Sequence, residues 1–315
     1  MASDTTTAWP APRGSIDMPA LNGFLSSVGS AAGPDLILSP GKELYHYTSL
    51  PGLLGVIENG DLWLTHTLYL NDEEEMAHGD HVAAEAIAAA LSRSAADVKK
   101  SAYLKQLEAL LGRPSNEGVY ICCFCQRDNL LSQWRGYGAN GAGVSLQFDS
   151  AGFAQWTGAD CPYGLMRFWK VFYKAETQRR IVDAAIDYSW SSQLDSVLCA
   201  QRAADAIQFF IPTFKNPDFE EEAEWRLIFT PNPLCLIKPC FRVRDTMLVP
   251  YYRLRDLAQS SLAAPHAAPP QLPIGHVTVG PGAAKVLNVE SVRMLLNGYG
   301  YTGIPIEASN TPFRG

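Results

Sequence analysis

A run of acidic residues directly before a hydrophobic strand is the part of the sequence best suited to chemistry. The stretch "NPDFEEEAEWRLIFT", residues 216–230, opens with turn-forming residues and contains Glu220, Glu221, Glu222 and Glu224. Alternate side chains of a strand share a face, so Glu222 and Glu224 are expected to point the same way. Like charges that close repel, so one carboxyl group is expected to be protonated or bound to a cation. We interpret the run as the candidate centre of chemistry; the alternative is a solvated edge.

Within this run, Glu224 is the candidate catalytic carboxylate. It is the last acid before the apolar residues 225–229, so its backbone is expected to be the best fixed of the four. Glu222, on the same face, is expected to contact an acceptor or to orient the attacking group. We interpret Arg226 as lying on the opposite face by alternation, where it serves as a buried ion-pair partner.

An early aromatic segment, "ELYHYTS", is predicted to be a strand and carries His46. A histidine among aromatic neighbours is either a satisfied core residue or a ligand contact, and both interpretations stay open here. Tyr47 is expected at the rim of the domain. Ser49 is expected to cap a short helix that ends at Gly60.

The glycine-rich segment "SQWRGYG" lies between two segments that are predicted to be buried strands. Loops held on rigid strands often carry function. We interpret Trp134 and Tyr137 as facing a ligand, with Arg135 as a cation that meets a pyrophosphate. The alternative is that the two aromatic rings fill the core.

Further acids occur at Asp72, Glu73 and Glu75, in "YLNDEEEM". Asp72 and Glu75 have the spacing of a capping box at the start of a helix, and we favour capping. A metal role for these carboxylates is the alternative, and we assign no metal ligands.

Cys122, Cys123 and Cys125 are clustered in "VYICCFCQ", but no second pair stands at the spacing of a zinc site. This apolar context favours reduced structural thiols on a buried strand.

The order of the predicted elements favours a single α+β domain over residues 41–315, with mixed, largely antiparallel sheets flanked by helices. Residues 1–40, rich in small and polar residues, are expected to form a tail or a strap. Strands are predicted at 44–48, 62–65, 119–125, 143–148 and 225–229. Helices are predicted at 75–93, 97–111, 175–211 (a hairpin or two helices) and 290–297.

The composition is that of a soluble globular protein, with 47% hydrophobic and 18% charged residues. A net charge of -7 argues against non-specific binding to nucleic acid or to an anionic membrane. No apolar run reaches the ~18–20 residues of a membrane helix, and the N-terminus lacks the order of a signal peptide. We therefore expect a cytoplasmic protein without membrane contact.

Seven short motifs occur in the order of a widespread bacterial family that is known as domain of unknown function 2971. They are "LYHYTS", "YLNDEEE", "CCFCQRDNLLSQWRGYG", "GVSLQFD", "KNPDFEEEAEWRLIF", "VTVGPGAA" and "SNTPFR". The chain resembles this family over residues 44–314. The family has no established activity, so the resemblance implies membership of the family but predicts no reaction.

Two of these motifs also resemble parts of the ADP-ribosyltransferase fold. "YHYTSLPGLLGVIENGDLWLT" is similar to the opening of DNA-targeting ADP-ribosyltransferase toxins, and Glu222-Ala223-Glu224 looks like the late Glu-x-Glu motif. This resemblance implies NAD as a substrate, with His46, Tyr47 and Thr48 in contact with it and His46 near its ribose. It further implies ADP-ribosyl transfer to a nucleic acid or protein acceptor that is not identified, in bacterial defence or as a toxin effector.

Carboxylates suit this chemistry because cleavage of the nicotinamide–ribose bond passes through an oxocarbenium-like cation, as in glycoside hydrolysis. A fixed negative charge stabilises that cation, and aromatic rings offer a face to nicotinamide. Two alternatives remain open from the sequence. One is a metal-dependent nuclease or hydrolase that uses the acids near 72–75 and 220–224; the other is a non-catalytic nucleotide sensor.

Overall fold

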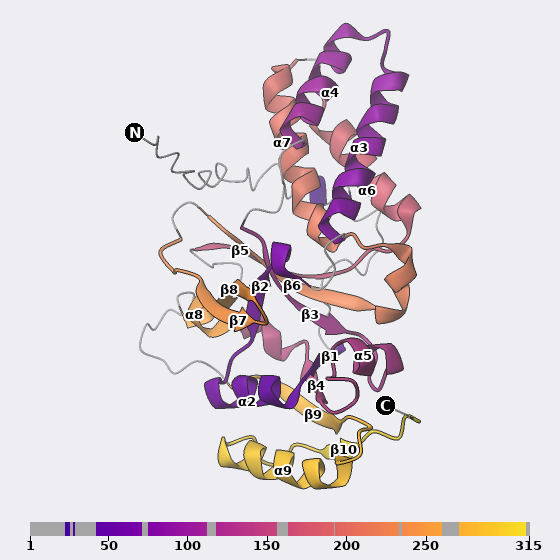
Figure 1. Ribbon diagram of the computed structural model, residues 1–315. Helices are drawn as coiled ribbons and strands as arrows, with labels where there is room; N and C mark the ends of the chain where they lie inside the picture. The colour runs from indigo at the N-terminus through magenta and orange to yellow at the C-terminus, as the bar shows by residue number, and fades with distance from the viewer. Residues whose placement is uncertain are drawn as a thin grey trace, which may run out of the picture.

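The computed structural model describes residues 23–25, 28, 42–70, 75–111, 118–155, 163–191, 193–232, 235–259 and 271–312. Helices gather at one end of the molecule and strands fill its middle, with α9 at the opposite end (Figure 1). The strands are β1 Glu43–Thr48, β2 Trp63–His66, β3 Tyr120–Cys125, β4 Val144–Asp149, β5 Gly164–Lys170, β6 Glu224–Pro231, β7 Cys240–Arg244, β8 Met247–Arg253, β9 Ile274–Val279 and β10 Ile306–Ala308. The α-helices are α2 Leu50–Asn59, α3 Glu75–Arg93, α4 Val98–Leu111, α5 Leu131–Gly136, α6 Ala175–Ser189, α7 Ser196–Phe210, α8 Leu254–Gln259 and α9 Lys285–Gly298. Short 3-10 helices are η1 Thr67–Tyr69, η2 Gly152–Gln155, η3 Ile211–Thr213 and η4 Pro217–Glu222.

The described strands join in one branched sheet. The main path runs β10-β9-β4-β1-β3-β2-β8-β7, while β6 pairs with both β3 and β5. Only the β9–β10 pair is parallel among these neighbours. This architecture confirms the predicted α+β class with a largely antiparallel sheet.

Strand β3 is the branch point of the sheet. One of its edges pairs with β6 over its whole length, from Tyr120 to Cys125. Its other edge is divided, because β2 pairs with its first residues and β1 meets it only at the pair Tyr45–Cys125. On its other edge β1 pairs with β4 over all six of its residues. The sheet is therefore forked between β1 and β3.

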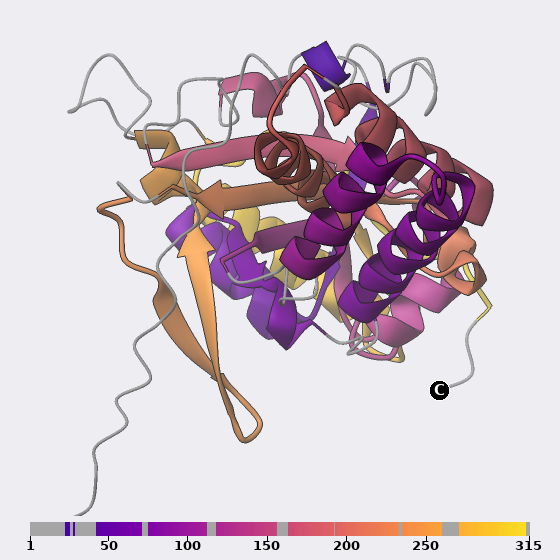
Figure 2. The same ribbon diagram turned by 90° about the horizontal axis from the view of Figure 1, so that it is seen from above.

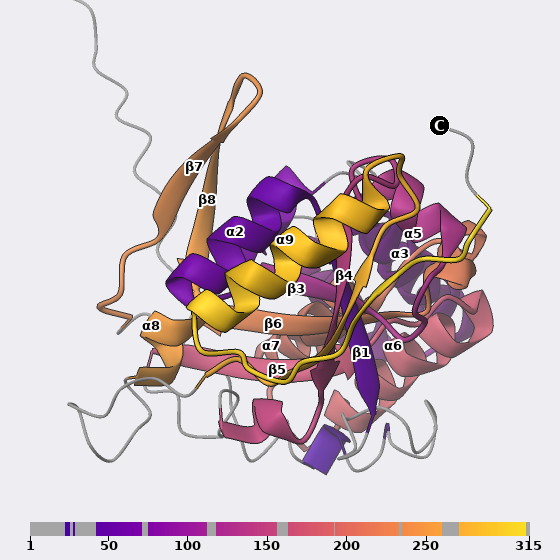
Figure 3. The ribbon, with the colours of Figure 1, turned by 90° about the horizontal axis from the view of Figure 1, so that it is seen from below.

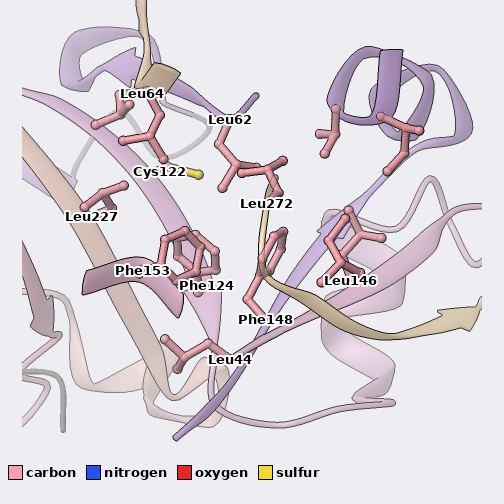
Figure 4. Packing of buried hydrophobic residues seen from close by; sticks show 14 of the residues in the cluster. Leu44, Leu62, Leu64, Cys122, Phe124, Leu146, Phe148, Phe153, Leu227 and Leu272 are labelled. Atoms are coloured by element: carbon pink, nitrogen blue, oxygen red, sulfur yellow. The ribbon is translucent and has the colours of Figure 1, made fainter. Parts of the chain in front are cut away.

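A hydrophobic core fills one face of the forked sheet. Its centre is Phe124, whose ring meets those of Phe148 and Phe153 edge-on at 5.7 and 5.5 Å (Figure 4). The ring of Phe168 meets it edge-on as well, at 5.1 Å. Helices α2 and α9 contribute buried residues to the same core and lie side by side (Figure 3). This packing fixes β3 from one side, while Cys123 and Cys125 lie on its other face beside Arg226 and Glu224 of β6.

Helices α3, α4, α6 and α7 form a second core at the helical end. Phe24 and Val28, from the segment predicted to be a tail or strap, are buried in this core. The ring of Phe24 meets that of Phe210 edge-on at 5.7 Å. The described part of the segment therefore packs on the helical core.

The β7–β8 hairpin projects from the body of the molecule (Figure 2). Phe241, Val243 and Leu248 on this hairpin are exposed.

No helix among the described residues is long and apolar enough to span a membrane.

The predicted helix after β1 forms as its sequence indicates. The hydroxyl oxygen of Ser49 accepts a hydrogen bond from the Gly52 amide at 3.1 Å. Gly60 ends the helix in the left-handed conformation, at φ 58°, where glycine is favoured. Among the other predictions, the side chains of Asp72, Glu73, Glu75 and Arg314 lie outside the residues that can be described.

The strap makes a testable contribution to stability. Phe24→Ala removes a ring that is 1% exposed, so we expect the free energy of unfolding to fall by about 3 kcal/mol or more. Val98→Ala, at a side chain that is 82% exposed, is the control and should change it by no more than about 0.5 kcal/mol. Urea denaturation of both variants measures the difference. Equal effects would show that the segment does not pack on the helical core.

Acid should weaken the fold through His66, which is buried at the end of β2. Burial lowers the pKa of His66 to about 4 from the ordinary 6.5. The unfolded chain therefore binds the proton more readily, and stability is lost as pH falls from about 6.5 towards 4.

The contribution should reach up to about 3 kcal/mol. Urea denaturation between pH 7.5 and 4.5 should show a shallower pH dependence in His66→Asn than in the wild type. His81→Asn, at an exposed position, is the control. An unchanged pH dependence in His66→Asn would contradict this role.

Candidate functional site

A pocket opens in the fork between β1 and β3. It encloses about 370 Å³ between protein atoms, part of it open to solvent. Its walls come from the early aromatic strand, from β3, from the glycine-rich segment and from the acidic run, three of which were predicted to converge. The lining residues are Tyr45, His46, Tyr47, Cys123, Phe124, Cys125, Gln133, Tyr137, Glu222 and Glu224.

The acidic run enters the pocket through a short helix, which corrects the expectation of a strand at Glu222. Residues 217–222 form the 3-10 helix η4, whose first turn is capped by the Asn216 side chain. Ala223 then adopts a left-handed conformation at φ 44° before β6 begins at Glu224. Strand alternation therefore does not relate the two carboxylates. They approach each other because the chain turns at Ala223.

Glu224 is held by two cations inside the protein. Arg226 donates to it from Nε and Nη2, both at 2.9 Å, and Lys215 donates from Nζ at 3.1 Å. Arg226 therefore lies on the same face as Glu224, since residues two apart on a strand share a face. The predicted buried ion pair is present, but its predicted placement on the opposite face is wrong.

Lys215 connects the two carboxylates of the pocket. Its Nζ donates to Glu222 at 2.5 Å as well as to Glu224. Burial lowers the pKa of Lys215, but the charges of Glu224 and Glu222 outweigh this effect and raise it above the ordinary value. The lysine is therefore a fixed cation between the two acids.

The two carboxylates differ in their access to the pocket. Burial raises the pKa of Glu224, while Lys215 opposes that shift. The bidentate Arg226 contact keeps Glu224 in its anionic form, because a guanidinium is always protonated. Glu222 is more open, with 14% of its side chain exposed, and the Tyr137 hydroxyl lies 3.5 Å from its Oε1. Glu222 is thus the carboxylate that a ligand can reach.

His46 fills part of the fork. Its Nδ1 lies 2.9 Å from the carbonyl oxygen of Cys123, and its ring packs near Phe124 at 5.7 Å. Burial lowers the pKa of His46, which favours the neutral ring. Donation from Nδ1 to the carbonyl then leaves Nε2 as a hydrogen-bond acceptor. In this arrangement His46 can accept a hydrogen bond from a ribose hydroxyl but cannot donate one to a ribose oxygen.

The structure does not bring His46 and Glu224 together on one face. Tyr45, Cys125 and Glu224 form one row across β1, β3 and β6. His46 is the next residue after Tyr45, so it is directed to the other face, where it pairs with Leu146 of β4. Both residues line the pocket because the pocket opens between the strands. A direct catalytic pair of His46 and Glu224 is therefore not what the geometry supports.

The neighbours of His46 on β1 have structural contacts. The Tyr47 hydroxyl donates to the carbonyl of Arg127 and accepts from the amide of Leu130, both at 3.0 Å, which ties down the loop after β3. The hydroxyl of Thr48 lies where a side chain at Gly52 would stand. Tyr47 lines the pocket, whereas Thr48 packs against helix α2.

The glycine-rich segment forms helix α5 instead of an open loop, and its residues divide in role. Trp134 is fully buried, and its Nε1 donates to Asn129 at 3.0 Å. This corrects the interpretation of Trp134 as a ligand contact and supports the alternative of a core residue. Arg135 is exposed and is not part of the pocket lining. Tyr137 does line the pocket, as predicted.

Gln133 and Lys215 are among the residues of the site that were not selected from the sequence. Gln133 is 7% exposed and lines the pocket. Lys215 organises the carboxylates. The sequence could have indicated Lys215, because a lysine shortly before an acidic run is a natural counterion for those acids.

The cysteines of β3 are free thiols. Burial raises the pKa of Cys122 to about 12 and that of Cys125 to about 11. Burial, followed by the charge of Glu224, also raises the pKa of Cys123. These protonated thiols are poor nucleophiles, which fits the structural role that was predicted for them.

A family of proteins described as "Protein of unknown function (DUF2971)" matches residues 133–227. The match confirms the family resemblance over this segment, which spans the site from Gln133 to the Glu224 cluster. No curated protein and no solved structure matched the chain.

The cluster around Glu224 predicts unequal effects for two matched substitutions. Glu224→Gln removes the negative charge that Arg226 and Lys215 share and leaves Lys215 with Glu222, so we expect the free energy of unfolding to fall by about 3–5 kcal/mol. Glu222→Gln leaves Lys215 paired with Glu224 and should cost only about 1–2 kcal/mol. Urea denaturation compares the two variants. Equal losses would contradict the assignment of Glu224 as the structural member of the pair.

Proposed function

We propose that the chain is an NAD-consuming enzyme of the ADP-ribosyltransferase type. It would cleave the nicotinamide–ribose bond in the fork pocket and transfer ADP-ribose to a nucleic acid or protein acceptor. One observation carries the proposal: residues of the early aromatic strand, the glycine-rich segment and the acidic run all line this pocket. Two of these segments are the ones that resemble ADP-ribosyltransferases.

Glu222 takes the part of the catalytic carboxylate in this proposal. A fixed negative charge stabilises the oxocarbenium-like state that forms as nicotinamide leaves, provided that it is already oriented. The ion pair with Lys215 orients Glu222, and the same lysine is fixed by Glu224. Glu224 is then a positioning residue that acts through Lys215 and does not itself touch the substrate.

The other pocket residues suit recognition of a nicotinamide riboside. Tyr45 and Tyr137 offer aromatic faces and hydroxyl groups. The Gln133 amide can donate and accept, which matches a carboxamide or a ribose hydroxyl. Nε2 of His46 can accept from a ribose hydroxyl.

The reaction is proposed for the cytoplasm. Described cysteines are all free thiols, which is the usual state of cysteine in a reducing compartment. NAD is a soluble nucleotide, so the proposal needs no membrane contact.

A non-catalytic nucleotide sensor is the second candidate, and the charge balance of the site favours it. Two carboxylates, Glu222 and Glu224, face two cations, Lys215 and Arg226. Because the charges of this cluster cancel, it can bind a polar ligand but offers little net negative charge to stabilise a cation that forms on the ligand. A metal-dependent nuclease at the same acids is less well supported, because the Lys215 ammonium occupies the place between the carboxylates that a divalent ion would need.

Release of nicotinamide from NAD tests the proposal. We expect the purified chain to release nicotinamide, alone or with nucleic acid or protein extract as a source of acceptor. Glu222→Gln keeps the shape of the side chain but removes its charge, so the rate should fall by ~10²–10³. Glu221→Gln is the matched control, because Glu221 is an exposed neighbour outside the pocket lining.

The outcomes separate the candidates. NAD binding without nicotinamide release would favour the sensor. Full activity in Glu222→Gln would move the chemistry away from this pocket. A melt of Glu222→Gln should show that the variant is still folded at the assay temperature, so that a lost rate is not a lost fold.

A further inference from the structure

We propose a second site, for a divalent transition-metal ion, formed by Asp128, His276 and Glu307. His276 lies on β9, Glu307 lies on the parallel neighbour β10, and Asp128 lies in the loop that follows β3. One potential ligand atom from each side chain lies within 4.8 Å of the other two. The site goes beyond the proposed function and does not depend on it.

The three side chains present acceptors to one another without a donor between them. Nε2 of His276 lies 3.7 Å from Oε1 of Glu307, which is too long for a hydrogen bond. Two ligands bound tetrahedrally to one zinc ion at about 2.0–2.2 Å stand about 3.4 Å apart, so this spacing needs only a small adjustment. Oδ1 of Asp128 is buried and has no hydrogen-bond partner within the described part of the chain.

Thr278 arranges two of the three ligands. Its hydroxyl donates to Oδ2 of Asp128 at 2.9 Å and lies 3.5 Å from Nδ1 of His276. With its proton on Nδ1, the imidazole faces the Thr278 oxygen and presents the lone pair of Nε2 to Glu307. Outer contacts of this kind commonly fix the tautomer and orientation of metal-bound histidines. Because Thr278 donates to Oδ2 of Asp128, Oδ1 remains available to an ion.

The donor set indicates the class of ion. One imidazole and two carboxylates without a thiolate suit Zn²⁺ or Mn²⁺ and do not suit Cu⁺. Three protein ligands leave at least one coordination position for water or for a ligand oxygen. In the described chain no lysine or arginine forms an ion pair with Asp128 or Glu307, so the negative charge there is available to a cation.

The site shares a face of the sheet with the fork pocket. His276 pairs with Gln147 on β4, and Gln147 pairs with Tyr45 on β1, which lines the pocket. Neighbouring strands lie ~4.8 Å apart, so His276 and Tyr45 are separated by roughly 10 Å. An ion at this distance is placed to attract an anionic ligand group towards the pocket.

Calorimetric titration of the chelator-treated full chain with Zn²⁺, and separately with Mn²⁺, tests the site. We expect one saturable site per chain for each ion. His276→Ala and Glu307→Gln should each weaken binding at least ~10-fold, as is usual when a ligand or its support is removed. Mn²⁺ is included because thiolates prefer softer ions, so free cysteines contribute little to its binding.

Glu290→Gln is the matched control. Its side chain is 64% exposed, close to the 67% of Glu307, and it stands on α9 away from the three ligands. Because Glu307 is exposed, Glu307→Gln should fold, and its melting temperature without metal should equal that of the wild type. The metal should raise the melting temperature of the wild type and of Glu290→Gln but not that of Glu307→Gln. Absence of saturable binding of both ions, or equal binding by all three variants, would overturn the proposal.

Discussion

The buried contact of Glu224 with Arg226 and Lys215 is the interaction on which the site depends. It connects the start of β6 with the chain after α7, since Arg226 also donates to the carbonyl of Pro212 at 2.7 Å. Placing these charges inside the protein is costly, and only nearly complete pairing offsets that cost. The arrangement fixes Lys215, and Lys215 in turn fixes Glu222 at the pocket. A structural ion pair thereby determines the position of a reactive carboxylate.

The fork in the sheet provides the second constraint. Strand β3 gives one edge to β6 and divides the other between β2 and β1. Where β1 leaves, the backbone of β3 needs a partner, and the carbonyl of Cys123 finds one in the His46 ring. The aromatic core on the other face holds β3 in place. The pocket is thus set into a sheet instead of lying at its end, and its walls are short, well-fixed segments.

The sequence was sufficient for most of the elements and for the convergence of three motifs, because long apolar runs and caps such as Ser49 have local causes. The sequence was insufficient where the position of a residue depends on a backbone turn beside it or on distant parts of the chain. The left-handed turn at Ala223 leaves no hydrophobic pattern, so Glu222 was placed on a strand. Trp134 and Tyr137 lie three apart in a segment taken for a loop, and only the fold shows that one is buried. The cluster of Asp128, His276 and Glu307 comes from three distant positions and has no sequence signature.

The central claim is that a nucleotide ribose binds in the fork between β1 and β3, against Glu222. A crystal structure of the chain with ADP-ribose or NAD bound tests it most directly. The account predicts a ribose hydroxyl within hydrogen-bond distance of the Glu222 carboxylate, with Glu224 still paired to Arg226 and Lys215. A nucleotide bound elsewhere with the fork unaltered, or bound directly by Glu224 after separation from Arg226, would contradict it.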